Sequence, residues 1–202
     1  MRVRTEEKRQ EIIRIAAELF EELGYERTSM SAIAARVGGS KATLYGYFQS
    51  KEELLRAVLD HDVNAEADRL LHEFLAEKDL RSGLIRLGIS YLSRHHSRAA
   101  SIRTVANQPI AQEFYETVLR PAWQRLADRF ATMMKEGRLK FADPWTTAMH
   151  WKGLNEWDML GRHLLSANAA ADPNDVVTAA TAAADAFLKV YATPPAAGEV
   201  AL

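Results

Sequence analysis

The sequence predicts an all-α fold, with three short helices at the N-terminus followed by a larger helical part. Long stretches are rich in Ala, Leu, Glu and Arg, which are good helix formers. Most of the six prolines and ten glycines lie at plausible helix boundaries, and no stretch shows the alternation of a strand. With 202 residues, of which 48% are hydrophobic, the chain can build a sizeable core in one or two domains.

The first helix is expected over residues 6–23. Its apolar residues recur at i, i+4, i+7, i+8 and i+11, which gives one buried face along a helix. Gly24 is a good C-terminal stop. The apolar face consists of Ile12, Ala16, Leu19, Phe20 and Leu23.

Three further helices follow at short intervals, each opened by a hydroxyl residue. Thr28 or Ser29 can cap the second helix, which Gly38-Gly39 ends. Ser40 can cap a third helix from Lys41 to about Phe48. The run Ser50-Lys51-Glu52-Glu53 is a capping box, and it predicts a long fourth helix that reaches about Ala76.

The remainder of the chain also reads as helices. The sequence predicts helices over about 80–95, 98–106 and 110–136, the last of them ended by Gly137. Asp143-Pro144 and Asp172-Pro173 each combine a capping residue with proline at the first helical position. These two pairs predict a helix that runs past Leu164 and a last helix to about Tyr191, which Thr193-Pro194-Pro195 stops.

Composition excludes several classes of protein. The chain has no cysteine, which rules out disulfides and thiolate metal sites and fits a reducing compartment. No apolar run approaches the roughly 18 residues that span a bilayer. The charged segment Met1–Glu11 lacks the apolar part of a secretory signal. A cytoplasmic protein with no membrane partner is therefore expected.

Charge is distributed unevenly along a chain whose net charge is −1. Residues 1–51 hold nine Lys/Arg and seven Asp/Glu, whereas residues 52–202 hold seventeen and twenty. Between Arg27 and Lys51 there are basic residues and no acidic one. This distribution predicts a local basic surface on a mildly acidic protein.

Three short helices with a glycine-containing turn between the second and third are typical of a helix-turn-helix. The stretch TSMSAIAARVGGSKATLYGYFQSKEELL, residues 28–55, resembles the DNA-binding signature of the TetR family, the tetracycline-repressor-like regulators. With the first helix, the resemblance covers about residues 8–58. It implies a helix-turn-helix DNA-binding domain over 1–51 and a helical ligand-binding and dimerisation domain over 52–192. A disordered tail is expected over 193–202.

The third helix is the candidate for base recognition. If Leu44 and Phe48 are buried, then at about 100° per residue Ala42 and Gly46 point away from the core. Two small residues there would let the helix backbone approach base edges in the major groove. The expected DNA-binding residues are Thr28, Ser29, Gly39, Ser40, Lys41, Ala42, Thr43, Tyr45, Gly46, Tyr47 and Lys51.

Particular roles follow from residue type and from the resemblance. Lys41 can reach a phosphate or a guanine edge, and Thr43 can touch a base edge or a thymine methyl. Tyr45 and Tyr47 can hydrogen-bond phosphates, although Tyr47 could equally pack against the first helix. Thr28, Ser29 and Lys51 lie at helix starts that suit a phosphate. The family usually has larger residues where this chain has Gly39 and Gly46.

The second domain is expected to pair with a second copy and to hold a small molecule. In TetR-like proteins the last two helices form a four-helix bundle with those of a partner. The corresponding residues are Trp157, Leu160, Leu164, Val176, Val177, Ala180, Ala184, Phe187 and Leu188. The resemblance also implies a pocket among the middle helices. Its candidate lining residues, each of which could be ordinary core, are Leu87, Tyr91, Ile102, Phe114, Trp123 and Trp151.

The ligand and the mode of regulation stay open in the sequence. Four tryptophans in the second domain hint at an aromatic ligand, whereas Arg94, Arg98 and Arg103 could favour an anionic one or form a solvated face. Adjacent His95 and His96 diverge on a helix and make a poor metal pair. No metal, cofactor or catalytic residue is expected.

The leading hypothesis is a homodimeric repressor of an unknown operator, released by an unknown small molecule. Two alternatives remain. One is a DNA-binding regulator without a small-molecule ligand. The other is an all-α enzyme or carrier with a vestigial DNA-binding unit.

Overall fold

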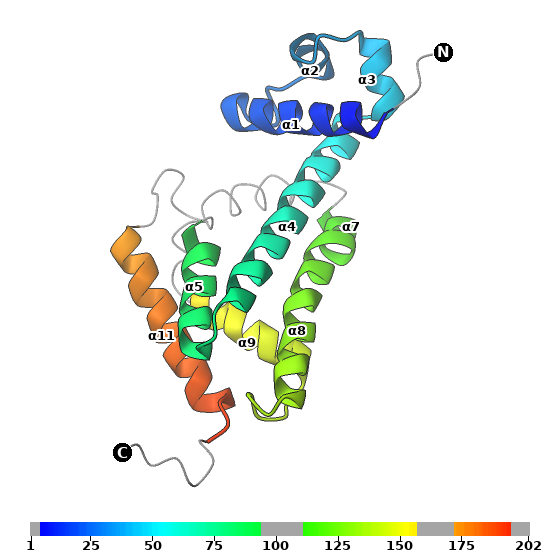
Figure 1. The fold of residues 1–202 in the computed structure, drawn as a ribbon. Helices are drawn as coiled ribbons and strands as arrows, with labels where there is room; N and C mark the ends of the chain where they lie inside the picture. Colours follow the sequence, from blue (N-terminus) through cyan, green and yellow to red (C-terminus); the bar gives the residue numbers. More distant parts are fainter. Residues whose placement is uncertain (1–4, 94–110, 157–171, 195–202) are drawn as a thin grey trace. The chain divides into compact units, whose positions relative to one another are not determined.

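The computed structural model describes residues 5–93, 111–156 and 172–194, and helices dominate this part of the chain, as predicted (Figure 1). Of these residues, 5–65 and 111–118 form one compact unit, and 66–93, 119–156 and 172–194 form a second. The chain passes from the first unit to the second within helix α4 (Lys51–Ala76), between Ala65 and Glu66. The domain boundary at residue 51 stays a prediction.

The first unit contains α1 (Glu6–Leu23), α2 (Met30–Arg36), α3 (Lys41–Tyr47), the first part of α4, and residues 111–118 with the short helix α7 (Ala111–Phe114). A hydroxyl caps each of the first three helices. Thr5, Ser29 and Ser40 accept hydrogen bonds from the backbone amides three residues on, at N–O distances of 3.3, 3.1 and 3.0 Å. These caps satisfy amides that have no partner inside a helix, and they fix where each helix begins. The predicted starts of these helices are confirmed.

The core of the first unit is aliphatic, with one aromatic ring at its centre. Leu44 and Phe48 are 2% and 1% exposed, so the predicted inner face of the third helix is confirmed. They pack with side chains from α1, α2 and α4. The buried partners include Ile12, Ala16, Leu19, Ile33, Val37, Leu54 and Val58.

The second unit contains the later part of α4 with α5 (Leu80–Ser93), α8 (Arg120–Lys135), α9 (Pro144–Glu156) and α11 (Pro173–Tyr191). Phe130 of α8 lies at the centre of its core. Its ring centroid is 6.4 Å from that of Phe74 and 5.2 Å from that of Phe187. Aromatic contacts at these distances add to the free energy gained by burying the rings.

Gly88 sets how closely α5 packs against its neighbours. A methyl group at this position would lie 2.6 Å from Asn155 Oδ1 on α9 and 2.9 Å from Ala180 Cβ on α11. Both separations are too short for real contacts. The missing side chain therefore lets three helices meet at one point, where Asn155 and Ala180 are each 1% exposed.

The helix expected over residues 110–136 is present over 111–135, and a π-helical turn widens it in its first half. The structure has a short helix α7 (Ala111–Phe114), a π-helical turn η1 (Tyr115–Leu119) and then α8. Pro121 gives the physical reason. Its nitrogen cannot donate to the carbonyl of Thr117, and its ring would crowd that carbonyl in a regular α-helix. The wider π turn accommodates this residue, so the predicted helix is confirmed over 111–135 but is not a regular α-helix throughout.

The two proline-initiated helices begin where the sequence predicts. Asp143 Oδ1 accepts a hydrogen bond from the Thr146 amide at 2.7 Å, and Asp172 Oδ1 accepts one from the Asn174 amide at 2.8 Å. The end of α11 is held by the backbone, because the Lys140 amide donates to the Tyr191 carbonyl at 2.8 Å. The predicted helix over 98–106, and the part of the predicted helix beyond Glu156, lie outside the described residues.

Within 5–93, 111–156 and 172–194, none of the helices combines the length and the apolar character that a bilayer crossing needs. The same residues contain no group of three His, Cys, Asp or Glu side chains that could hold a metal ion.

Candidate nucleic-acid interface

A tight turn joins α2 to α3 and sets the direction of α3. Gly38 has φ +69°, a backbone conformation that side-chain-bearing residues rarely adopt. Gly39 has no such constraint, and a methyl group there would make ordinary contacts with Thr43 at 3.8 and 3.9 Å. The turn therefore requires the first glycine. The second leaves open space beside the side chain of Thr43.

Helix α3 has one buried side and one open side. Leu44 and Phe48 anchor it in the core of the first unit, while Lys41, Ala42 and Tyr45 are exposed. Thr43, Gly46 and Tyr47 are half-buried. The open side therefore carries a cation, a hydroxyl, a phenol and two positions with little or no side chain. A short helix with this composition can approach the floor of a groove closely and still donate hydrogen bonds.

The serines that cap α2 and α3 are also exposed to solvent. Ser29 and Ser40 are exposed, and both already accept an amide hydrogen bond as caps. The Ser40 and Thr43 hydroxyls lie 2.9 Å apart and share a hydrogen bond. This bond orients Thr43 on the open side of α3. Ser29 can still donate its own proton to a phosphate, and Ser40 can do so when Thr43 is the donor of their shared bond.

Thr28 does not fit the role expected from the sequence. It is 1% exposed, and its hydroxyl donates to the carbonyls of Leu19 at 3.1 Å and Gly24 at 2.9 Å. Those two oxygens lie at the C-terminal end of α1, one on the helix and one on its C-cap residue. The side chain therefore closes the end of α1. A phosphate contact by Thr28 is wrong as a prediction, because the hydroxyl is inside the protein.

Tyr47 connects α3 to the start of the chain. Its hydroxyl oxygen accepts a hydrogen bond from the Thr5 amide at 3.0 Å, and its half-buried ring packs against the core of the first unit. This contact holds the N-terminal cap of α1 beside α3. Of the two roles considered for Tyr47, packing is present in the structure, and a phosphate contact stays a prediction.

Lys51 has protein partners of its own. Its Nζ donates to the Tyr25 carbonyl at 2.9 Å and lies 3.5 Å from the Glu26 carbonyl. The ammonium also lies 4.2 Å from the centroid of the Tyr25 ring. These contacts tie the start of α4 to the loop that follows α1. The geometry therefore favours a positioning role for Lys51 over the expected phosphate contact.

Acidic groups occupy the N-terminus of α4. Glu53 accepts a hydrogen bond from the Gln49 amide at 2.6 Å, and the Ser50 hydroxyl accepts one from the Glu53 amide at 3.1 Å. Hydrogen bonds from its own amide and from Ser50 lower the pKa of the Glu52 carboxyl. Burial, followed by the charge of Glu52, raises the pKa of Tyr25 to about 12. The Ser50 half of the predicted capping box is confirmed, whereas Glu53 bonds the amide one residue before the cap. The two carboxylates take the place expected for a phosphate.

The basic residues near α3 differ in how far they are neutralised. Arg36 pairs with Glu22 at 3.1 Å, and Arg27 Nε donates to the Leu23 carbonyl at 2.7 Å. Lys41 is exposed, and among the described residues no ion pair or hydrogen bond of its ammonium is present. Lys41 is therefore the cation of this surface that is best placed to meet a nucleic acid.

The second unit brings three of the predicted ligand-binding residues together. The ring centroids of Tyr91, Trp123 and Trp151 lie 5.4 to 6.5 Å apart. Leu87 is buried in the same core. Phe114 instead belongs to the first unit, so the structure does not place it with the others. Ile102 lies outside the described residues, as do Arg94, Arg98, Arg103, His95 and His96.

The expected dimer face of α11 is largely turned inward. Four of the predicted residues are at most 4% exposed and pack inside the protomer: Val176, Ala180, Ala184 and Phe187. They cannot also lie on a surface, so this part of the prediction is wrong. Val177 is 47% exposed and Leu188 is half-buried. Trp157, Leu160 and Leu164 lie outside the described residues.

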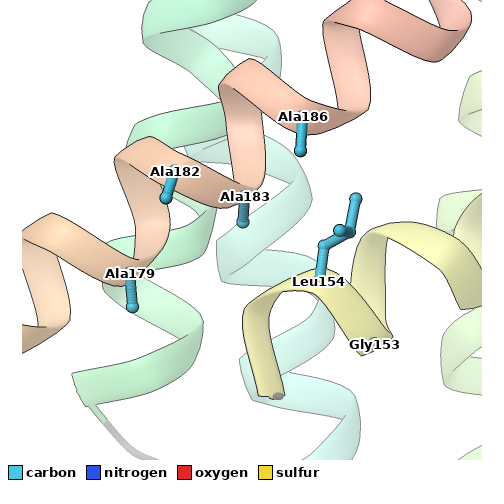
Figure 2. A pocket seen from close by; sticks show the side chains of 6 residues that line it. All are labelled: Gly153, Leu154, Ala179, Ala182, Ala183 and Ala186. Carbon is cyan, nitrogen blue, oxygen red and sulfur yellow. The ribbon is translucent and has the colours of Figure 1, made fainter. Parts of the chain in front are cut away.

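A different side of α11 is open, and together with α9 it forms an apolar groove of about 350 Å³ (Figure 2). Figure 2 shows alanine methyl groups of α11 and the side chain of Leu154 of α9 around it. The spacing of the alanines, at i, i+3, i+4 and i+7, is the signal in the sequence that could have indicated this face. The lining residues are Gly153, Leu154, Ala179, Ala182, Ala183 and Ala186.

Curated relatives match about a third of the chain. The transcriptional activator FasR of Mycolicibacterium smegmatis is 41% identical over 63 residues, and an HTH-type transcriptional regulator of Staphylococcus aureus strain USA300 is 41% identical over 64. The alignments cover 31% and 32% of this chain. They cover only 29% and 35% of those two proteins.

Solved structures match almost the whole chain. A TetR-family regulator from Mesorhizobium loti superposes with a TM-score of 0.83 at 24% identity, over 95% of this chain and all of that one. The flavonoid-responsive regulator FrrA gives a TM-score of 0.68 at 29% identity, with the same coverage. Both superpositions support the same helical architecture.

Two family models match successive parts of the chain. Residues 12–58 match the model of bacterial regulatory proteins of the tetR family. Residues 89–193, more than half of the chain, match the C-terminal domain of AefR-like transcriptional repressors. These matches agree with the helix-turn-helix geometry of α2 and α3 and with the helical second unit. The chain belongs to the TetR family of transcriptional regulators.

Proposed function

We propose that the protein is a homodimeric repressor that binds an operator through α3 and leaves it when a small molecule binds the second unit. It would act in the cytoplasm, where bacterial operators lie. The observation that carries the proposal is the two-sided character of α3. Leu44 and Phe48 are buried, and Lys41, Ala42, Thr43, Tyr45 and Gly46 lie on the open or half-open side.

The open side of α3 suits a major groove, which is wide enough to admit one α-helix. Gly46 and Ala42 have little or no side chain, so the backbone of α3 can come close to base edges. Lys41 and Thr43 then supply the groups that distinguish bases, and Tyr45 can reach the phosphates beside the groove. Ser29, Ser40 and Tyr47 can add phosphate hydrogen bonds, while Thr28 and Lys51 hold the helices in position.

The test begins with selection of duplexes that bind the protein from a random DNA pool. Operator affinity is then measured over a series of salt concentrations. Neutralisation of about six phosphates should make the affinity fall steeply and linearly on logarithmic axes. A selected duplex that binds no better than random competitor would overturn the proposal.

Gly46→Leu tests the groove contact directly. Leucine is a better helix former than glycine, so the variant should fold at least as well as the parent. It should nevertheless lose operator affinity by about 100-fold, because the added side chain holds α3 off the bases. Gln10→Leu, which adds leucine to the exposed side of α1, is the matched control.

A second copy of the chain is the proposed occupant of the groove between α9 and α11. Its lining is apolar, and small side chains on α11 allow a helix to approach closely. A two-fold dimer would also present two copies of α3 to half-sites about one DNA turn apart. We place the interface on the side of Ala182 and Ala186, and not on the side of Val177.

Two arginine substitutions distinguish these sides. Ala182→Arg lies in the groove and should raise the dimer dissociation constant at least 100-fold, as measured by analytical ultracentrifugation. Val177 is also exposed, but it does not line the groove, so Val177→Arg should leave the dimer intact. If Val177→Arg disrupts the dimer and Ala182→Arg does not, the interface lies on the other side of α11.

A small molecule would release the protein from its operator by changing the populations of two conformations of the protein. A ligand that prefers a conformation with poor DNA binding shifts the protein toward that conformation by its differential affinity. The similarity to a flavonoid-responsive regulator supports a search for such a ligand in the second unit. Operator affinity should fall when the correct ligand is added, and unchanged affinity with every bound compound would count against release.

A further inference from the structure

Three aromatic side chains from three helices meet inside the second unit. Tyr91 of α5 lies 5.4 Å from Trp123 of α8 and 5.7 Å from Trp151 of α9, measured between ring centroids. The two tryptophan rings are 6.5 Å apart. Tyr91 and Trp151 are 2% and 1% exposed. The three rings therefore pack against one another, and a flat apolar molecule that entered beside them would meet aromatic surfaces.

One polar atom of this cluster lacks a partner. The indole Nε1 of Trp151 is buried, and among the described residues no hydrogen-bond acceptor reaches it. Buried tryptophan N–H groups normally have an acceptor, and leaving one without a partner costs free energy. The group can only donate a hydrogen bond, so the missing partner must be an acceptor such as a carbonyl oxygen.

Asn155, one turn further along α9, is also incompletely bonded, but its geometry differs. Its amide nitrogen donates to the Trp151 carbonyl at 2.9 Å. Its Oδ1 has no hydrogen-bond donor among the described residues, and it lies directly against Gly88 of α5. That packing leaves little room for another molecule at Oδ1. The Trp151 N–H is therefore the polar group that remains for a ligand.

The charges beside the cluster neutralise one another. Lys152 forms an ion pair with Glu156, and Glu156 also accepts a hydrogen bond from the Tyr91 hydroxyl. The Lys152 ammonium lies 5.7 Å from the centroid of the Trp123 ring, so the cation also interacts with that ring. A charged ligand would have to break this pair or lie beside a like charge. The site therefore favours an uncharged molecule.

We infer that the second unit binds an uncharged, planar aromatic molecule whose carbonyl oxygen accepts a hydrogen bond from Trp151 Nε1. Tyr91 and Trp123 supply the aromatic surfaces, and the Lys152–Glu156 pair excludes charged analogues. The inference rests on the proposed function, in which a small molecule binds this unit, and it names the chemical class. Because Trp151 is 1% exposed, the packing around α9 must open for the ligand to enter.

Coumarin, a fused bicyclic compound with one carbonyl oxygen, is a suitable probe. The protein carries four tryptophans, so ¹⁵N labelling of the indoles gives four N–H signals, and Trp151→Phe identifies the one from Trp151. Added coumarin should move that proton signal downfield, as a new hydrogen bond does. Naphthalene, which has no acceptor, should not produce the downfield shift. The anion 2-naphthoate and a naphthylmethyl trimethylammonium cation should bind at least tenfold more weakly.

Trp151→Phe keeps an aromatic ring and removes the N–H. It should weaken coumarin about tenfold, the usual effect of one hydrogen bond, and leave naphthalene unchanged. Because Trp151 is 1% exposed, the smaller ring leaves a cavity, and thermal stability should fall in the absence of either probe. Trp145→Phe on the same helix is the matched control and should affect neither probe.

Several results would overturn the inference. They are equal coumarin affinity in Trp151→Phe and parent, tighter binding of either charged probe, or a long-lived water on the Trp151 N–H that no probe displaces. Probe binding is measured without DNA. A failed operator experiment would therefore count against the proposed function and leave this result standing.

Discussion

The two units hold their functional side chains in opposite ways. In the first, the side chains proposed to meet DNA lie on the outside of a seven-residue helix, α3, which two buried anchors hold in place. In the second, the candidate ligand contacts are inside, where Tyr91 and Trp151 are almost fully buried. A DNA surface can therefore be assembled by local signals and a small core. A ligand site of this kind depends on how distant helices pack.

The largest expected effect tests whether the units are energetically separate. Phe48→Ala removes the central ring of the first core and should cost about 3–5 kcal/mol. Operator binding should be lost, and amide hydrogen exchange should speed up in α1 to α3 while α5 and α11 stay protected. Phe187→Ala in the second core is the counterpart and should reverse that pattern. Faster exchange throughout the protein in both variants would mean that the units unfold together.

Gly88→Ala tests how strictly the second unit depends on helix packing. The added methyl group would lie within 3 Å of both Asn155 Oδ1 and Ala180 Cβ. Relief of this overlap should cost about 2 kcal/mol of unfolding free energy, measured by denaturant titration. At Gly153, an added methyl group meets no atom within 4 Å. Gly153→Ala should therefore be neutral or slightly stabilising, and an equal loss in both variants would contradict the packing account.

Alkaline pH tests the junction of α1 and α4 in the first unit. Burial and the charge of Glu52 raise the pKa of Tyr25 to about 12, so the folded protein keeps the phenol proton after the unfolded chain has lost it. The contribution of this proton to the free energy of unfolding is therefore fully present below pH 10. It falls by about 1–2 kcal/mol as pH rises from 10 to 12. Tyr25→Phe should not show this loss of unfolding free energy between pH 10 and 12. Identical slopes for parent and variant would contradict it.

The smallest effect concerns the local signals of the first unit. Ser40 caps α3 by accepting a hydrogen bond from the Thr43 amide, and its hydroxyl also bonds to Thr43. Ser40→Ala should cost about 1 kcal/mol, whereas Ser40→Gly should cost only a few tenths. Chemical denaturation followed by circular dichroism can measure this difference. Equal losses would mean that the cap does not set the start of α3.

The first unit was predictable because short-range signals determine it. Ser29, Ser40 and the apolar pair Leu44 and Phe48 specify helix starts and the buried side of α3 without knowledge of the rest of the chain. The burial of Thr28 could not be predicted in this way. Its hydroxyl bonds to carbonyls at the end of α1, and that contact exists only after α1 and α2 have packed.

In the second unit, the sequence predicted the positions of the helices but not which side of each helix is buried. Alanines lie on several sides of α11, so hydrophobic spacing did not tell the buried Ala180 and Ala184 from the open Ala182. The π-helical turn before Pro121 also escaped prediction, because the apolar pattern on both sides of it is helical. Among the described residues the N–H of Trp151 has no acceptor, and nothing in the sequence signals this, since it depends on which acceptors the fold brings near.

The contact at Gly88 also restricts how this protein can change over evolutionary time. Three helices touch at this position, so a larger residue is tolerated only after both Asn155 and Ala180 have become smaller or moved. Substitutions at these three positions must therefore arise in a particular order, with the partners first. Homologues with a side chain at the equivalent of Gly88 should carry compensating residues on both neighbouring helices.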